Sequence, residues 1–352
     1  MRPVVVAVLI AWAVGLPVAV WVAIAVRHHR RSRRVQREQL VRSILYRTLE
    51  HPGRSAQIVG TLGAADQRML EAKARALLPA LRGDDRETLA QLLESRGAVD
   101  AARHKCRSHR PAARVGACRL LGEAGSSFAV LDLVPLLNDR SPGVRRTAAR
   151  ALGRLGQPSA VPALLGALDR RHPPPVDEVA DAIEAIRDFP VEILRHGVLR
   201  GPEPTRLVAA ELLGRLQVLD AFDDLVEVVG LDPSLEVRVR AARALGNLGS
   251  PWAVAPLLCH FHGGPQALRA EAVHAIGRLG AAEAVPDLLL LLVGDNLRLS
   301  ESAAEALAGI APLGVAVLEE LAADDHHAST QLARRALAGL PAGPRRHLSR
   351  ES

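Results

Sequence analysis

Residues 139–168 read DRSPGVRRTAARALGRLGQPSAVPALLGAL, and this stretch decides the fold. Val144, Ala148 and Leu152 recur at four-residue spacing, which places an apolar stripe along one face of a first helix. Gly156 follows the last periodic residue, where a left-handed helix end favours glycine. A second apolar stripe predicts a second helix. Such a hairpin has more apolar surface than it can bury alone, so we expect it to stack on copies of itself.

The ends of these two helices carry signals of their own. We expect Asp139 or Ser141 to accept hydrogen bonds from the first free N–H groups of the first helix. We expect Ser159 to cap the second helix, because Pro162 then falls in the first turn, where its missing N–H costs nothing.

The pattern recurs along most of the chain, in segments such as ACRLLGEAG, AARALGRLG, ARALGNLG and VHAIGRLG. The residues equivalent to Gly153, here called the anchors, are Gly122, Gly153, Glu184, Gly214, Gly246, Gly277 and Ala308. Successive anchors lie 30 to 32 residues apart. This regularity predicts an all-α fold, an α-solenoid of helix pairs with a period of about 31 residues.

Arginine recurs eight positions before the anchors. Val176 and Ser300 are the exceptions. The recurrent arginines are Arg114, Arg145, Arg206, Arg238 and Arg269.

The motif V-R-x-x-A-A-x-A-L-G-x-L-G, followed by A-V-P-x-L-L, resembles the short bacterial HEAT-like repeats named after phycobilisome lyases. It is nearly complete at 144–165, and the resemblance covers roughly residues 108–340. The resemblance implies that the recurrent arginines form a ladder with acidic residues of neighbouring repeats. Asp139 and Asp232 fit the acidic position, but Ser108 and Gly263 do not, so we expect an interrupted ladder.

The formal net charge of +7 is concentrated near the N-terminus. Residues 27–42 hold seven arginines and one acid, and Arg2 supplies the remaining excess charge, so the rest of the chain is balanced. Aromatic residues make up only 2% of the chain. A neutral solenoid with few stacking groups is not expected to bind nucleic acid.

Residues 4–26 contain no charge, and 23 residues at about 1.5 Å each can cross a hydrocarbon core of about 30 Å. A cleaved signal peptide is the alternative, but RHHRRSRR follows the apolar run at once and resists translocation. We therefore expect a single-pass anchor in the inner (plasma) membrane. The positive-inside rule puts the N-terminus outside and the solenoid in the cytoplasm.

The basic residues that follow the span are expected to lie against anionic lipid headgroups. The alternative is that they act only as a topology signal. The cluster consists of Arg27, Arg30, Arg31, Arg33 and Arg34.

These features divide the chain into five expected parts. In order, they are a transmembrane helix (1–26), a basic juxtamembrane helical segment (27–65), degenerate capping helices (66–107), the HEAT-like solenoid (108–340) and a disordered tail (341–352). Helices are expected at 35–50, 66–81 and 85–96. Residues 288–293 are a short apolar run expected in a buried second helix.

No arrangement typical of catalysis stands out. Three cysteines show no CxxC spacing. Two groups of metal-ligating residue types lack a standard zinc spacing: His104, Cys106, His109 and Cys118, and Asp324, Asp325, His326 and His327. We expect no catalytic residue, cofactor, metal or small-molecule substrate.

The second helices of such solenoids are expected to line the concave face, and here they are acidic. An acidic groove favours a basic protein segment and repels phosphate backbones. The alternative is that these acids are solvated or pair with arginines of neighbouring repeats. The candidate residues are Asp223, Asp224, Glu227 and Asp287.

The resulting functional hypothesis is a membrane-anchored cytoplasmic scaffold whose protein partner is membrane-associated. A bilin-lyase-like enzyme or chaperone is one alternative, which the name of the repeat family suggests. A nucleic-acid-binding helical-repeat protein is the other.

Overall fold

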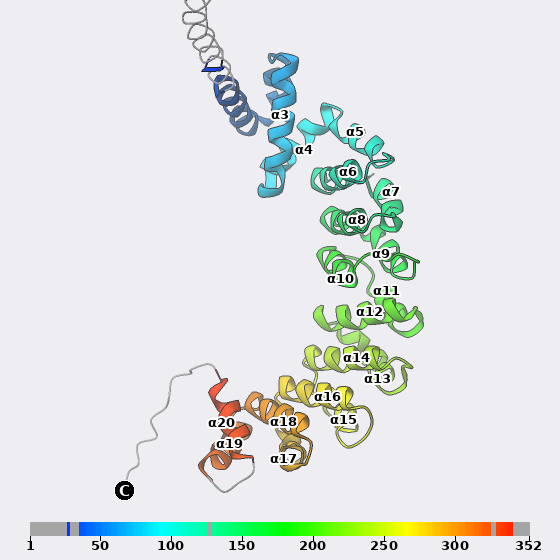
Figure 1. The fold of residues 1–352 in the computed structure, drawn as a ribbon, viewed down its shortest axis with the longest axis vertical. Coiled ribbons are helices and arrows are strands. Elements are labelled where there is room, and N and C mark those ends of the chain that lie inside the picture. The colour runs from blue at the N-terminus through cyan, green and yellow to red at the C-terminus, as the bar shows by residue number, and fades with distance from the viewer. Residues whose placement is uncertain (1–26, 29–34, 126–128, 325–328, 341–352) are drawn as a thin grey trace, which may run out of the picture. The chain divides into compact units, whose positions relative to one another are not determined.

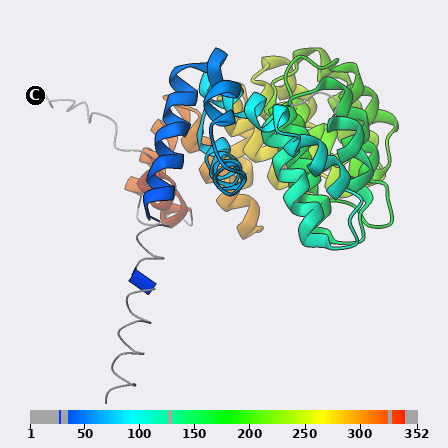
Figure 2. The ribbon, with the colours of Figure 1, turned by 90° about the horizontal axis from the view of Figure 1, so that it is seen from above.

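The computed structural model describes residues 27–28, 35–125, 129–324 and 329–340, and every regular element in these ranges is helical (Figure 1, Figure 2). The expected span at 4–26 and the expected tail at 341–352 lie outside the described residues. Within the described residues, no helix is long and apolar enough to cross a membrane.

The chain divides into two compact units, residues 1–129 and residues 130–352. The first unit contains a helix at 35–50, η1 (Pro52–Arg54), α2 (Ser55–Gly60), α3 (Ala64–Leu77), η2 (Leu78–Ala80), α4 (Gly83–Ser95), α5 (Ala98–Lys105) and α6 (Pro111–Ala124). The three helices predicted here are present within a few residues of their expected bounds, but α5 was not predicted. Since α6 packs against α4 and α5, these three helices form one group, whereas the expected division falls at 107/108.

The second unit is a series of helix pairs. Each pair has a first helix and a second helix, and every first helix except the last holds an anchor. The first helices are α8 (Pro142–Leu155), α10 (Val176–Ala185), α12 (Glu203–Arg215), α14 (Leu235–Leu248), α16 (Gln266–Leu279), α18 (Leu297–Gly309) and α20 (Thr330–Ala338). The second helices are α9 (Val161–Ala167), α11 (Glu192–Arg200), α13 (Phe222–Leu231), α15 (Val254–Leu258), α17 (Val285–Val293) and α19 (Leu313–Ala323), while α7 (Ala129–Leu133) and η3 (Val134–Asn138) precede α8.

The first helix of the defining stretch is confirmed. It begins at Pro142, ends at Leu155 and is followed by Gly156 with φ of 64°, the left-handed conformation that glycine adopts without strain. Its cap differs from the expectation. Ser141 makes no side-chain capping bond, and Asp139 Oδ1 accepts from the backbone N of Ser141 (2.8 Å), one step before the helix.

The expected cap of the second helix is wrong. Ser159 lies inside a short 3-10 helix, η4 (Pro158–Ala160), and α9 begins only at Val161. A 3-10 turn precedes three further second helices, namely η5 (Leu219–Ala221), η6 (Pro251–Ala253) and η7 (Ala282–Ala284). The turn tightens the corner before each helix with i to i+3 bonds.

The apolar run at 288–293 is only partly buried. Leu288, Leu291 and Leu292 of α17 are buried, but Leu290 and Val293 are 68% and 57% exposed. The run therefore forms one inward stripe of an amphipathic helix and is not buried on every side.

Anchor glycines let the first helices of the second unit approach closely. A Cβ atom on Gly153 would lie 2.7 Å from Cα of Ala182 in the next first helix. The corresponding distances are 2.6 Å from Gly214 to Ala244, 2.8 Å from Gly246 to Ala275 and 2.7 Å from Gly277 to Ala306. No real Cβ atom tolerates such distances, so these contacts require glycine.

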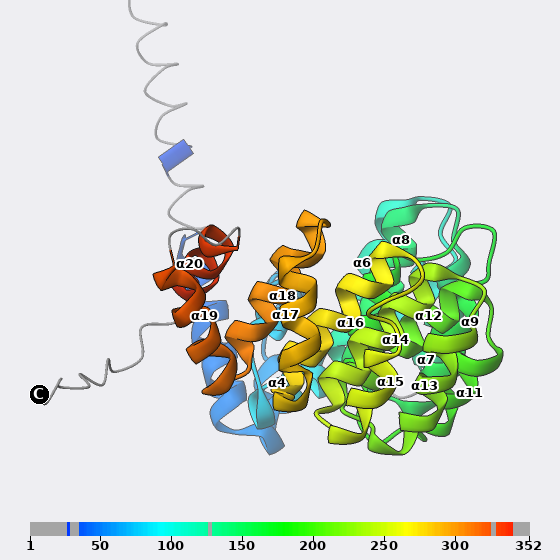
Figure 3. The same ribbon diagram turned by 90° about the horizontal axis from the view of Figure 1, so that it is seen from below.

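This close approach decides which row of helices lies inside the curve of the second unit. From α8 to α18, the first helices lie on the inner side and the second helices on the outer side (Figure 1, Figure 3). The expectation that second helices line the concave face is therefore wrong for this unit. The physical reason for the difference is the set of glycine contacts, because they make neighbouring first helices lie closer together than neighbouring second helices.

Candidate interaction surface

The recurrent arginines share one role, which is to satisfy main-chain carbonyl groups in the segment before their own helix. The donor–acceptor distances are 2.7 Å from Arg114 to Ser108 O, 2.9 Å from Arg145 to Asp139 O, 3.0 Å from Arg206 to Gly201 O, and 2.7 Å from both Arg238 to Val229 O and Arg269 to Phe261 O. Val229 lies in the last turn of α13, and Gly201 directly follows α11. Carbonyls at a helix end lack intrahelical partners, and a cation there is favourable.

Ser300, an exception to the arginine pattern, performs the same task without a charge. Its hydroxyl donates to Leu291 O (3.0 Å) and Gly294 O (3.2 Å) at the end of α17. Six of the seven positions therefore carry a hydrogen-bond donor that reaches main-chain carbonyls, and Val176 is the exception.

The ladder that the family resemblance implies has a clear bidentate step at Arg206. Its Nε and Nη2 atoms donate to the Asp232 carboxylate at 2.7 and 3.0 Å. The hydrogen bonds to Asp232 raise the pKa of the Arg206 guanidinium, against the opposing effect of burial. Arg145 reaches the next repeat differently, because its Nε donates to the main-chain oxygen of Pro173 (3.1 Å).

A second set of ion pairs, which the sequence analysis missed, links successive first helices. The partners stand three positions before one anchor and six positions before the next, 28 or 29 residues apart. The pairs are Arg150–Glu178 (Nη2–Oε1 2.5 Å), Arg243–Glu271 (Nη2–Oε2 2.6 Å) and Glu211–Arg240. His274 and Ser302 occupy the same register, 3.2 Å apart. Opposite charges separated by nearly one period were the signal that could have revealed the set.

Glu271 is the most enclosed carboxylate of this set, with 9% of its side chain exposed. It accepts from Arg243 on α14 and from Arg278 on its own helix (Nη2–Oε1 3.0 Å). Burial alone would raise the pKa of the Glu271 carboxyl, but the hydrogen bonds from the two arginines outweigh it and hold the pKa below its ordinary value.

The four candidate acidic residues do not form one surface. Asp223 and Glu227 share the exposed side of α13, whereas Asp224 accepts from Arg195 Nε on α11 at 2.6 Å and is mostly buried. Asp287 lies on α17, two second helices further along the row, with its Oδ1 3.6 Å from His262 Nε2. Asp224 therefore fits the alternative hypothesis, in which an acidic residue pairs with an arginine of a neighbouring repeat.

Glu227 borders a hollow of about 330 Å³ at the ends of α11 and α13. Arg200, Arg206 and Asp232 also line it, together with Leu231 and Pro233. Two arginines facing two carboxylates give the hollow mixed charge, in place of the acidic groove that the sequence suggests. This surface lies on the outer row of helices.

The remaining candidate residues are placed as follows. Arg27 of the basic cluster lies in the described helical residues 27–28, and Arg30, Arg31, Arg33 and Arg34 lie outside the described residues. Within the part of the chain that the structure describes, no three His, Cys, Asp or Glu side chains gather closely enough to hold a metal ion.

Comparison with known proteins identifies the repeats. Residues 99–187 and 191–265 match the family model of HEAT repeats, a little under half of the chain. The match begins inside α5 and is interrupted directly after α10. These two segments are HEAT repeats, and the described chain is a helical-repeat solenoid.

Three solved structures with related architecture are distant in sequence. An engineered protein is 22% identical, with a TM-score of 0.38 over 80% of this chain and 87% of that one. The complex of CpcE and CpcF of phycocyanin lyase from Nostoc sp. is 22% identical, with a TM-score of 0.26 over 77% of this chain and 94% of that one. Yeast importin-beta (Kap95p) is 13% identical, with a TM-score of 0.46 over 81% of this chain and 45% of that one. None of the curated proteins compared with the chain matches it significantly in sequence.

Proposed function

We propose that this chain is a membrane-anchored HEAT-repeat scaffold that binds a protein partner with its cytoplasmic solenoid. The observation that carries the proposal is the stack of helix pairs in residues 130–324 and 329–340, which presents two rows of helix surface and matches the HEAT-repeat model at 130–187 and 191–265. Helical solenoids of this kind are typical of protein–protein interaction scaffolds, because their repeated helices build extended binding surfaces.

The membrane part of the proposal rests on the sequence. Residues 4–26 are uncharged, and the arginine cluster that follows them favours retention on the cytoplasmic side. A tether raises the effective concentration of a membrane-associated partner, so a modest affinity of the solenoid is sufficient.

The proposal treats the chain as a binding protein and not as an enzyme. The ion pairs between first helices hold their charged side chains in structural contacts, and the balanced charge of the solenoid disfavours a nucleic-acid phosphate backbone. A pigmented protein after purification from its natural host would favour the bilin-lyase alternative instead.

The first experiment is affinity purification of the full chain from cross-linked membranes, with identification of the co-purifying proteins. We compare it with a chain that lacks residues 1–26 and with a chain whose span is replaced by an unrelated helix of the same orientation. The wild type and the replaced span should capture the same partner and complement a deletion strain, whereas the truncated chain should do neither. Full complementation by the truncated chain would overturn the tethered scaffold.

Topology has a separate test. A fluorescent protein fused after Ser352 should fluoresce, and alkaline phosphatase fused at the same residue should be inactive, because the first folds in the cytoplasm and the second requires export. The opposite pair of results would place the solenoid outside.

A further inference from the structure

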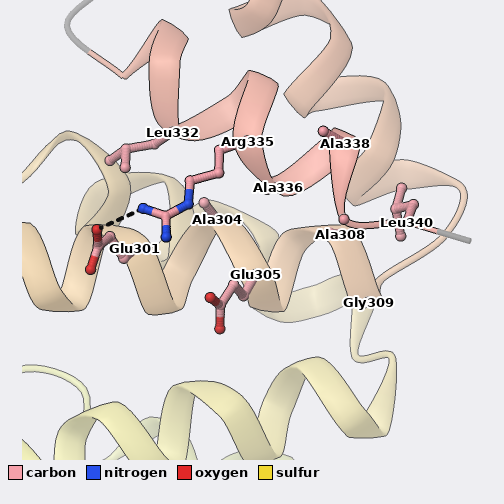
Figure 4. Close-up of a pocket in the computed structure, with 11 residues that line it drawn as sticks. Glu301, Ala304, Glu305, Ala308, Gly309, Leu332, Arg335, Ala336, Ala338 and Leu340 are labelled. Atoms are coloured by element: carbon pink, nitrogen blue, oxygen red, sulfur yellow. Dashed lines mark hydrogen bonds and ion pairs between the residues drawn. The ribbon is translucent and has the colours of Figure 1, made fainter.

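A groove of about 750 Å³ separates α18 from α20 (Figure 4). Its walls consist of one stripe from each helix, with small side chains between charged ones. The α18 stripe is Glu301, Ala304, Glu305 and Ala308, and the α20 stripe includes Leu332, Arg335 and Ala336. Ala304 and Ala308 are only 2% and 9% exposed, so the groove has a closed floor of small side chains, and its apolar wall is the half-buried Leu332 and Ala336 below a charged rim.

The groove lies where the repeat pattern changes at its last anchor. Ala308 occupies the position at which Gly214, Gly246 and Gly277 admit the next first helix. Ala308 is 9% exposed, and α18 and α20 pack less closely than the glycine-anchored helices do. The opening thus coincides with a difference in sequence at one defined position.

The rim carries more negative than positive charge. Glu301 Oε1 lies 3.4 Å from Arg335 Nη1, and the Arg335 side chain is 81% exposed. Glu305 is 68% exposed, with its Oε2 3.8 Å from His274 Nδ1. Exposed ion pairs contribute little, so an incoming cation can replace Arg335 at Glu301 at little cost.

We propose that this groove binds a short segment of a partner protein in which an arginine or lysine lies beside small apolar residues. The apolar residues would cover the half-buried Leu332 and Ala336, and the cation would reach the carboxylates of Glu301 and Glu305. The inference rests on the proposed scaffold function and adds to it the location and chemistry of one binding site. The two carboxylates would repel a phosphate backbone.

The test begins with a phage-displayed library of random 12-residue peptides, selected on the full chain in detergent. Parallel selection uses Ala308→Leu, which fills the groove with a larger side chain. Peptides enriched on the wild type and not on Ala308→Leu should pair Arg or Lys with Ala, Val or Leu. Equal enrichment on both chains, or enrichment of acidic peptides, would overturn the proposal.

The most enriched peptide is then labelled with fluorescein, and its binding is followed by anisotropy. Glu301→Gln and Glu305→Gln should each weaken binding about tenfold, since each removes a carboxylate at the rim. Glu236→Gln, at an exposed carboxylate on α14, is the matched control and should leave binding unchanged. Far-UV circular dichroism establishes that Ala308→Leu is folded, and the two glutamine variants test the site independently of it. Unchanged binding in both would overturn the proposal.

Two other occupants give distinct results. If a chain without residues 341–352 binds the peptide more tightly, the groove belongs to the chain's own C-terminal segment, whose arginines include Arg345 and Arg346. If Ala308→Leu changes the mass measured by light scattering, the groove is an interface between copies. Either result overturns the proposal.

Failure of the groove and failure of the scaffold are distinguishable. If Ala308→Leu still captures the cellular partner of the wild type, the groove proposal fails and the scaffold stands. If the wild type captures no partner from membranes, the scaffold itself fails.

Discussion

The junctions between neighbouring first helices in residues 130–340 are of two kinds. Where the anchor is Gly153, Gly214, Gly246 or Gly277, backbone meets backbone and the next helix packs closely. Where the anchor is Glu184 or Ala308, the next helix packs less closely. One side chain per repeat therefore controls how tightly the stack is joined.

The two loose junctions use the extra space differently. Glu184 of α10 forms an ion pair with Arg215 of α12, and Arg215 Nη2 also lies 3.4 Å from Asp181 Oδ1. At Ala308 the space stays open and becomes the groove beside α20. The HEAT-repeat match is interrupted between 187 and 191, just after the helix that holds Glu184.

The largest effect is expected at a close junction. In Gly246→Ala the new Cβ would lie 2.8 Å from both Cα and Cβ of Ala275, so α14 and α16 must separate. Overpacking of this kind costs about 1–3 kcal/mol. Urea unfolding followed by circular dichroism at 222 nm should show the loss. A variant as stable as the wild type would contradict the role given to the anchor glycines.

The second-largest loss of stability is expected when an ion pair between closely packed first helices is removed. Glu271→Gln removes the charge that accepts from Arg243 and Arg278, and we expect a loss of about 1–2 kcal/mol at pH 7. Because the folded pKa of Glu271 is lowered, its contribution is fully present above the unfolded carboxyl pKa of about 4.3 and disappears as pH falls through the folded value.

The measurement is the difference in unfolding free energy between Glu271→Gln and the wild type in a series of buffers from pH 7 downward. The difference should shrink below about pH 4.3, the ordinary glutamate pKa. A difference that stays constant to the lowest pH at which both chains fold would indicate lost packing in place of lost charge.

Stability should change in the opposite direction when a glycine that has open space at its Cβ position is replaced by alanine. Gly116 lies inside α6, and a Cβ atom there meets nothing within 4 Å. Gly116→Ala should stabilise the chain by about 0.5–1 kcal/mol, because alanine loses less conformational freedom in a helix. Gly246→Ala is the matched variant at an anchor. If both variants changed the free energy of unfolding in the same direction, anchor glycines would not differ from other glycines.

The smallest change in stability is expected when the anchor of a loosely packed junction is replaced by glycine. Ala308→Gly loses helix propensity but lets α20 approach α18, so the net change should stay within about 0.5 kcal/mol. The informative readout is hydrogen exchange, which should slow in α20 as the groove closes. Unchanged exchange would mean that other residues keep the two helices apart.

Local features of the fold followed from the sequence, and features that depend on neighbouring repeats did not. The bounds of α8 and the conformation of Gly156 follow from short-range helix rules, so they were predicted correctly. The position before the anchors was recognised, but its task was not, because Arg238 and Ser300 act on carbonyls of the preceding helix. The inner row was assigned to the wrong helices, since that choice depends on the spacing between repeats.

The candidate surface shows the same limit. Asp223, Asp224 and Glu227 are neighbours in sequence, yet the pairing of Asp224 with Arg195 belongs to the adjoining repeat. The groove at Ala308 requires knowledge of how closely α20 packs, which no single repeat contains.

The loose junction at Glu184 affects how the second unit can bend. The anchor-glycine contacts and the ion pairs between first helices each join a helix to an adjacent one, so we expect the second unit to behave as a chain of nearest-neighbour couplings. The first helices from α12 to α18 are coupled by three successive glycine contacts, so we expect them to move as one rigid body. We expect bending at the looser junction of α10 with α12. A partner that binds on both sides of this junction would fix the angle between its two sides, whereas one that binds only to α12–α18 would leave that angle unchanged.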